Sequence, residues 1–202
     1  MIAAMMVAAI SANAQNEVGQ FTLMPKAGIN ISKVTNSDSK TKVGLVAGVE
    51  AEYGIAEKFG LQFGVLYSMQ GDKPKVGSGS EKLDYINIPI MAQYYVIPGL
   101  AIKAGVQPGF LVRAKNKYDY EDGGIAIHTD ADIKDACNKV DLSIPVGISY
   151  EYKSFVLDAR YNIGLTKVYK DIDADAAELF GISNKTCRNS VFQITLGYKF
   201  AL

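Results

Sequence analysis

Apolar and other side chains alternate with a period of two over most of the chain. From Val43 to Tyr53 every odd-numbered residue is apolar, while the even-numbered residues are Gly, Val or Glu. A helix would place Val46 and Glu50 on one stripe, which cannot serve as a core face. Alternation of this kind predicts β-strands with two unlike faces. The pattern recurs in eight segments, 21–32, 43–53, 59–70, 85–96, 100–113, 141–151, 155–166 and 192–202.

The connections between these segments alternate between short and long. The short ones are 54–58, 97–99 and 153–154, and the long ones are 33–41, 70–81, 114–139 and 169–188. Up-and-down antiparallel strands would place the short turns at one end and the long loops at the other, as in outer-membrane barrels. A strand of about 12 residues, tilted by about 40°, rises roughly 30 Å. The predicted fold is therefore all-β, an eight-stranded antiparallel up-and-down transmembrane β-barrel.

Alternation alone does not say which face of the barrel points outward. A soluble periplasmic, lipocalin-like barrel would turn its apolar face inward and bind a lipophile. We favour an outward apolar face, because it carries no charge in any segment and its aromatic residues gather near the segment ends, as in membrane girdles. The opposite face holds five acids and five bases, and this balance suits a closed, neutralised lumen. These residues are Glu50, Glu52, Asp141, Glu151, Asp158, Lys26, Lys103, Arg113, Arg160 and Lys199.

The first residues of the chain predict export. Residues 1–10 are apolar, and Ala12-Asn13-Ala14 fits the small-x-small pattern of signal-peptide cleavage. We therefore expect a signal peptide over 1–14, a barrel domain over 15–202, and a location in the cell outer membrane. The chain has 21 basic and 21 acidic side chains, and this zero net charge predicts no nucleic-acid partner.

Five stretches of the wall segments form recognisable motifs: LYSMQG (66–71), LDYINIPI (83–90), YYV (94–96), DARYNIGL (158–165) and FQITLGYKF (192–200). These stretches resemble the porin-family (PorT-like) outer-membrane β-barrel domain common in Bacteroidetes. The resemblance implies the barrel fold and the outer membrane, and one relative is linked to protein export by the type IX system. Separately, Thr195, Gly197, Phe200 and Leu202 resemble the C-terminal signal read by the barrel-assembly machinery, which implies that machinery as a partner during insertion.

The sequence predicts no catalytic residue, no cofactor and no dedicated metal site. The single histidine, His128, falls in the longest loop, and no Gly-x-Ser-x-Gly or comparable signature accompanies it. The acidic run 171–178 resembles the start of a calcium loop, but Ala176 replaces the required Gly and Ile182 replaces the final Glu. Only a looser contact with a divalent cation remains as an alternative there.

Cys137 and Cys187 each lie just before a strand that begins at the loop end. Strands two apart in a sheet are separated by about 10 Å, whereas a disulfide requires Cα atoms within about 7 Å. Because an exported protein meets an oxidising compartment, a disulfide between Cys137 and Cys187 stays an open alternative to two thiols.

Together these features predict a non-enzymatic outer-membrane barrel. Side chains fill the interior of an eight-stranded barrel, so we expect a charge-filled, closed lumen. Outer-membrane lipid would surround the wall, and loops 114–139 and 169–188 would carry any interaction with a surface or secretion partner. The alternatives are an accessory component of protein secretion (type IX-like) or envelope assembly, and the soluble lipocalin-like binder.

Overall fold

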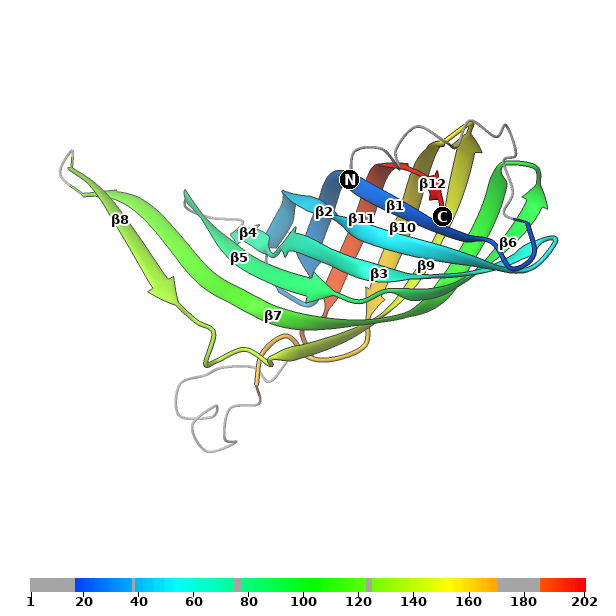
Figure 1. Cartoon of the computed structure of the whole chain (residues 1–202). Coiled ribbons are helices and arrows are strands. Elements are labelled where there is room, and N and C mark those ends of the chain that lie inside the picture. Colours follow the sequence, from blue (N-terminus) through cyan, green and yellow to red (C-terminus); the bar gives the residue numbers. More distant parts are fainter. Residues whose placement is uncertain (1–16, 38, 75–77, 123–124, 171–185) are drawn as a thin grey trace, which may run out of the picture.

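The computed structural model describes residues 17–37, 39–74, 78–122, 125–170 and 186–202, and these residues form one closed β-barrel (Figure 1). The predicted signal peptide, 1–14, and the acidic run 171–178 lie outside the described residues. The strands are β1 (Phe21–Val34), β2 (Ser39–Ala56), β3 (Phe59–Gln70), β4 (Asp72–Pro74), β5 (Ser78–Asn87), β6 (Ile90–Ile97), β7 (Leu100–Asp122), β8 (Ile125–Asp132), β9 (Val140–Tyr152), β10 (Phe155–Gly164), β11 (Asn189–Tyr198) and β12 (Phe200–Ala201).

The barrel closes because β1 pairs antiparallel with both β2 and β11. Ile29, for example, lies opposite Leu45 on one side and Ile194 on the other. β5 and β6 form one wall strand interrupted at Ile88 and Pro89, since a proline cannot donate to the ladder. β12 likewise continues the wall strand of β11. The wall therefore has eight antiparallel strands, which confirms the predicted number and up-and-down order.

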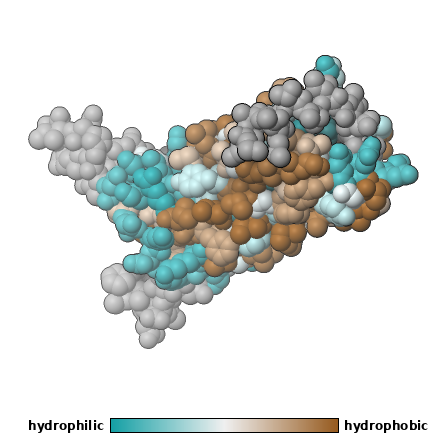
Figure 2. All heavy atoms as spheres, viewed as in Figure 1, coloured by the Kyte–Doolittle hydropathy of each residue, from teal (hydrophilic) through white to brown (hydrophobic). Residues whose placement is uncertain are grey.

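The apolar face of the wall points outward. Leu45, Ile148 and Leu196 are more than half exposed, whereas Glu50, Asp158 and Arg160 are at most 1% exposed. Hydrophobic residues cover the middle of the wall, and hydrophilic residues gather toward the end from which β7 and β8 project (Figure 2). The soluble lipocalin-like alternative is therefore wrong, because such a barrel needs an apolar interior.

Aromatic residues cluster at the short-turn end of the wall, as predicted. Phe59 lies 4.9 Å from Tyr94 between ring centroids, and Phe155 lies 5.2 Å from Tyr198. The second pair is edge-to-face, with an interplanar angle of 86°. Aromatic rings in contact at one rim of an outward apolar band are typical of a membrane interface.

The prediction of a loop over 114–139 is wrong, because most of these residues form β-strands. β7 runs through Asp122 and pairs with β8, so that Asn116 lies opposite Ala131. β5 flanks the other side of β7, with Ser78 opposite Asp119. These three strands form a sheet that projects well past the rest of the barrel (Figure 1). We call β8, the part of β7 from 116 to 122 and the part of β5 from 78 to 81 the extension.

Sequence alternation predicts that Arg113 faces the lumen, and this prediction is wrong. A bulge between Asp84 and Tyr85 on the β5–β7 ladder shifts the register by one residue. As a result Leu111 and Ala114 are buried inside, while Val112 and Arg113 are both exposed. An extra residue in one strand reverses the alternation beyond it.

Candidate functional site

The middle of the barrel holds a buried cluster of charged side chains around Arg160. Arg160 Nη1 lies 2.9 Å from Glu50 Oε1, and Arg160 Nε lies 2.8 Å from Asp158 Oδ1. Lys26 donates to Glu50 at 2.8 Å, and Lys103 donates to Asp158 at 2.7 Å. We call these five residues the central cluster. Each of their charged groups therefore faces an opposite charge at hydrogen-bond distance, which a buried ion requires.

Two glycines make room for the central cluster. A methyl group on Gly147 would come within 2.7 Å of Arg160 Cβ, and one on Gly64 within 2.7 Å of Glu50 Cγ. Both positions lie directly opposite cluster residues, since Gly147 pairs with Arg160 and Gly64 with Glu50. The glycines of the inward face thus allow long charged side chains to cross a narrow lumen.

A second charged cluster lies nearer the short turns. Lys199 Nζ lies 3.1 Å from Glu52 Oε2 and 2.5 Å from Glu151 Oε2. Tyr95 donates its hydroxyl to Glu52 at 2.8 Å. This turn-side cluster has one base and two acids, a formal charge of −1, whereas the central cluster has three bases and two acids, a formal charge of +1. The formal charges of the two clusters together sum to zero.

Uncharged amides lie on the loop side of the central cluster. Asn30 donates to Ser68 Oγ at 2.9 Å and to Met69 O at 3.1 Å. The side-chain oxygens and nitrogens of Asn162 and Gln193 are buried and make no hydrogen bond with another described residue. Buried amides of this kind are ordinarily satisfied by ordered water.

An apolar cluster that the sequence did not predict lies at the loop end of the barrel. It brings together residues from several strands with the segments around Cys137 and Val168. We call it the loop-end plug. Its buried members are Val34, Leu83, Tyr85, Leu111, Ala114, Cys137 and Val168, with Ile133, Tyr169 and Cys187 packed against them.

Cys137 and Cys187 both belong to this plug, but no disulfide joins them in the structure. Cys137 pairs with Tyr169 in a β-bridge, and the backbone N–H of Val168 donates to the carbonyl of Cys187. The chain at 168–169 therefore runs between the two cysteines, which keeps them about two strand spacings apart. Burial raises the pKa of the Cys137 thiol to about 12, so this side chain is a neutral apolar group.

Next to the loop-end plug, the carboxylate of Glu81 and the phenol of Tyr169 form a hydrogen-bonded pair. Tyr169 donates its hydroxyl to both carboxylate oxygens of Glu81, at 2.7 and 2.8 Å. Glu81 lies beyond the apolar band, since its neighbour Lys82 and the opposed Lys115 face outward at that level. Burial raises the pKa of Glu81 to about 6, and the Tyr169 hydrogen bond only partly opposes this rise. The pair fastens the segment after β10 to β5.

The sequence also singles out His128 and the acidic run 171–178. His128 lies on β8, opposite Asp119. No group of three or more His, Cys, Asp or Glu among the described residues could hold a metal ion. No helix in the described part of the chain is long and apolar enough to cross a membrane. The looser cation contact proposed for 171–178 lies outside the described residues.

Comparison with known proteins agrees with this architecture. A family model described as outer membrane protein beta-barrel domain matches residues 13–170. The comparison with curated proteins found no match. Among solved structures, Ail of Yersinia pestis, in complex with the heparin analogue sucrose octasulfate, has a TM-score of 0.51 and 15% identity over 91% of this chain and 100% of that chain. Neisserial surface protein A has a TM-score of 0.51 and 17% identity over 89% of this chain and 97% of that chain.

Proposed function

This chain belongs to the outer membrane protein beta-barrel domain family, and from that premise we propose that it is a closed, non-enzymatic surface protein that binds a partner through its extension. The observation that carries the proposal is the length of β7. That strand has 23 residues, whereas a barrel strand needs only about 9–11 residues to cross a membrane. The additional residues build a sheet outside the membrane, where a partner can reach it.

Backbone pairing holds the strands of the extension together. β7 pairs along its outer half with β5 on one side and with β8 on the other. β8 pairs with β7 alone among the described strands, so its second edge has backbone groups available to a partner strand. A projecting sheet edge on a rigid barrel is a common arrangement for recognition.

The charge of the extension favours a basic partner. Asp130, Asp132 and Asp135 are exposed near its base. The segment 114–139 has six acids and four bases, and the exposed pair Lys117–Asp130, with N···O at 3.2 Å, adds little net charge. An acidic surface attracts basic protein segments and accelerates their association.

The structural relatives support a surface role by their names. Ail is described as an attachment invasion locus protein, and the other relative is described as a surface protein. Their shared fold with this chain does not by itself carry a function. The proposal therefore depends on the extension, and the names only agree with it.

The test is a trimmed barrel. Asn116 and Ala131 lie opposite each other, so an Asn-Gly turn can replace residues 117–130 without changing the register. We expect the trimmed chain to insert and to remain heat-modifiable on gels, because the wall strands pair without the extension. It should no longer complement a deletion strain, and it should lose the partners that the full chain captures by cross-linking.

A charge variant separates the extension's shape from its charge. Replacement of Asp130, Asp132 and Asp135 by Asn should weaken capture while leaving the strands intact. If the trimmed barrel complements the deletion fully, the wall or the lumen carries the function and the proposal is wrong. If the captured partners are components of a secretion or assembly apparatus, the protein is an accessory of that machinery, as the PorT-like resemblance would imply.

We also infer that the chain belongs with the PorT-like barrels inside its broader family. The resembling stretches fall on wall strands β3, β5, β6, β10 and β11. They include residues that face one another in the lumen, such as Arg160 and Gln193, which pair across β10 and β11. Exchange of wall segments between this chain and a PorT-like protein, followed by a folding assay, tests this placement.

A further inference from the structure

Basic side chains surround the barrel at the level where the apolar band meets the loop end. They are exposed or half-exposed, and they come from most of the wall strands or from residues next to them: Lys33, Lys40, Lys82, Arg113, Lys115, Lys139, Lys167 and Arg188. We call them the basic collar. Most acids at this level are buried, because Asp72, Glu81, Asp84 and Asp141 are all at most 9% exposed. Asp132, opposite Lys115, and Asp135 are the exposed acids near this level. Since the exposed bases outnumber them, the accessible charge at this rim is positive on balance.

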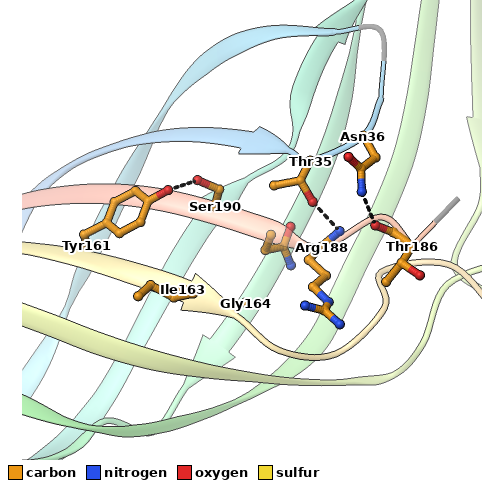
Figure 3. A pocket seen from close by; sticks show the side chains of 9 residues that line it. Thr35, Asn36, Tyr161, Ile163, Gly164, Thr186, Arg188 and Ser190 are labelled. Atoms are coloured by element: carbon orange, nitrogen blue, oxygen red, sulfur yellow. Dashed lines mark hydrogen bonds between the residues drawn. The ribbon is translucent and has the colours of Figure 1, made fainter.

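Within the basic collar, Arg188 lies just before β11 on a segment that hydrogen bonds hold in place. The backbone N–H of Arg188 donates to Thr35 Oγ1 at 3.0 Å, and Asn36 Nδ2 donates to the carbonyl of Thr186 at 2.8 Å. These bonds attach the segment to the end of β1. In Figure 3 the Arg188 side chain extends away from Thr35, toward the chain that follows Gly164. No acidic side chain among the described residues pairs with its guanidinium.

Two hollows meet at Arg188. One has a volume of about 330 Å³ and includes Tyr161 and Ile163 in its lining. The other has a volume of about 640 Å³, and its lining includes Lys139 and Leu165. Tyr161, Ile163 and Leu165 belong to the outward apolar face of β10 and the residue after it. Each hollow thus has an apolar side toward the membrane band and a basic side toward the loops.

We propose that these hollows bind the phosphate group of an anionic lipid in the leaflet next to the loops. Arg188 and Lys139 would pair with the phosphate oxygens, since guanidinium and ammonium groups suit that geometry and charge. The acyl chains would lie along Ile163 and Leu165, where a free phosphate has nothing to contact. A basic rim directly above an apolar wall fits an amphiphile with an anionic head. This inference depends on the membrane barrel and not on a partner of the extension.

The test measures lipid retention by the full chain. The protein is refolded in phosphatidylcholine vesicles that contain a minor fraction of phosphatidic acid, extracted in mild detergent, and its bound lipids are identified by native mass spectrometry. We expect clear enrichment of phosphatidic acid over phosphatidylcholine. The double variant Arg188→Gln, Lys139→Gln should reduce that enrichment by about fivefold for each removed charge. Arg188→Lys should retain most of it, because the charge remains.

The matched control removes two lysines from the opposite rim. Lys58→Gln with Lys153→Gln takes away the same charge at exposed short turns, and we expect enrichment to stay unchanged. Gel heat-modifiability confirms that each variant is folded. Equal retention of the two lipids by the wild type, or an equal loss in the control variant, would overturn the proposal. Complete competition by inorganic phosphate would also overturn it, because it would show a phosphate site with no part for the acyl chains.

Discussion

The central cluster holds three cations and two carboxylates, all buried, at hydrogen-bond distance from one another. Removal of one charge therefore leaves its partners buried without compensation. We expect Glu50→Gln to destabilise the barrel by about 3–5 kcal/mol. Guanidinium unfolding in lipid vesicles, followed by gel mobility without boiling, measures this change. Glu57→Gln in an exposed turn is the control and should stay within about 0.5 kcal/mol of the wild type. Equal midpoints for Glu50→Gln and wild type would show that the cluster adds no stability.

Glu81 gives the barrel a pH dependence of defined sign. Its pKa in the folded protein is about 6, against an ordinary value of 4.5. The folded state therefore binds a proton at a higher pH than the unfolded state does, and stability rises as pH falls from about 6 to 4.5. This difference between the folded and the ordinary pKa corresponds to about 2 kcal/mol.

The variant Glu81→Gln isolates this effect, because Gln keeps an oxygen that can accept from Tyr169 but does not titrate. Unfolding midpoints for the wild type and for Glu81→Gln, measured across this pH range, should converge toward the acid end and separate above pH 6, with the variant more stable. A constant difference between the two proteins at every pH would contradict the role given to Glu81.

At the scale of single strands, a substitution on β9 tests whether the outward apolar face contacts lipid. Ile148 is 54% exposed on the middle of that strand. We expect Ile148→Arg to cost about 2–4 kcal/mol near the bilayer midplane and to slow insertion into vesicles. Thr41→Arg is the control, since Thr41 is exposed and pairs with Asp72 beyond the band. If the two variants insert equally well, the wall around Ile148 does not contact lipid.

Sequence alternation predicted the eight wall strands because a strand's two faces depend only on local pattern. It failed at Arg113, since the bulge opposite Asp84 adds one residue without changing composition. The sequence predicts a loop over the outer half of β7 because charged residues dominate it, whereas pairing with β5 and β8 makes it a strand. The loop-end plug was missed because its members, such as Val34, Leu83 and Val168, are far apart in the sequence.

At the scale of the whole molecule, charge and polarity are sorted by position. The two lumen clusters neutralise each other, the outward wall is apolar, the collar is basic and the extension carries exposed acids. A chain with zero net charge thereby presents surfaces of opposite sign to the membrane surface and to the space beyond it. Net charge could not reveal this separation, because it sums over surfaces that meet different surroundings.

We expect the same sorting to place two barriers in series along the lumen, and conductance measurements test both. The central cluster holds paired charges in the middle, and the loop-end plug gathers Leu83, Leu111 and Val168 at the loop end. We expect planar-bilayer recordings of the wild type to show no steady unitary conductance. Arg160→Ala should also be silent once gel mobility shows that it is folded, because the plug still closes the loop end. Leu83→Ala, which thins the plug alone, should be silent for the complementary reason. Stable channels in the wild type would mean that the lumen is open, and channels in only one variant would identify the single barrier that seals it.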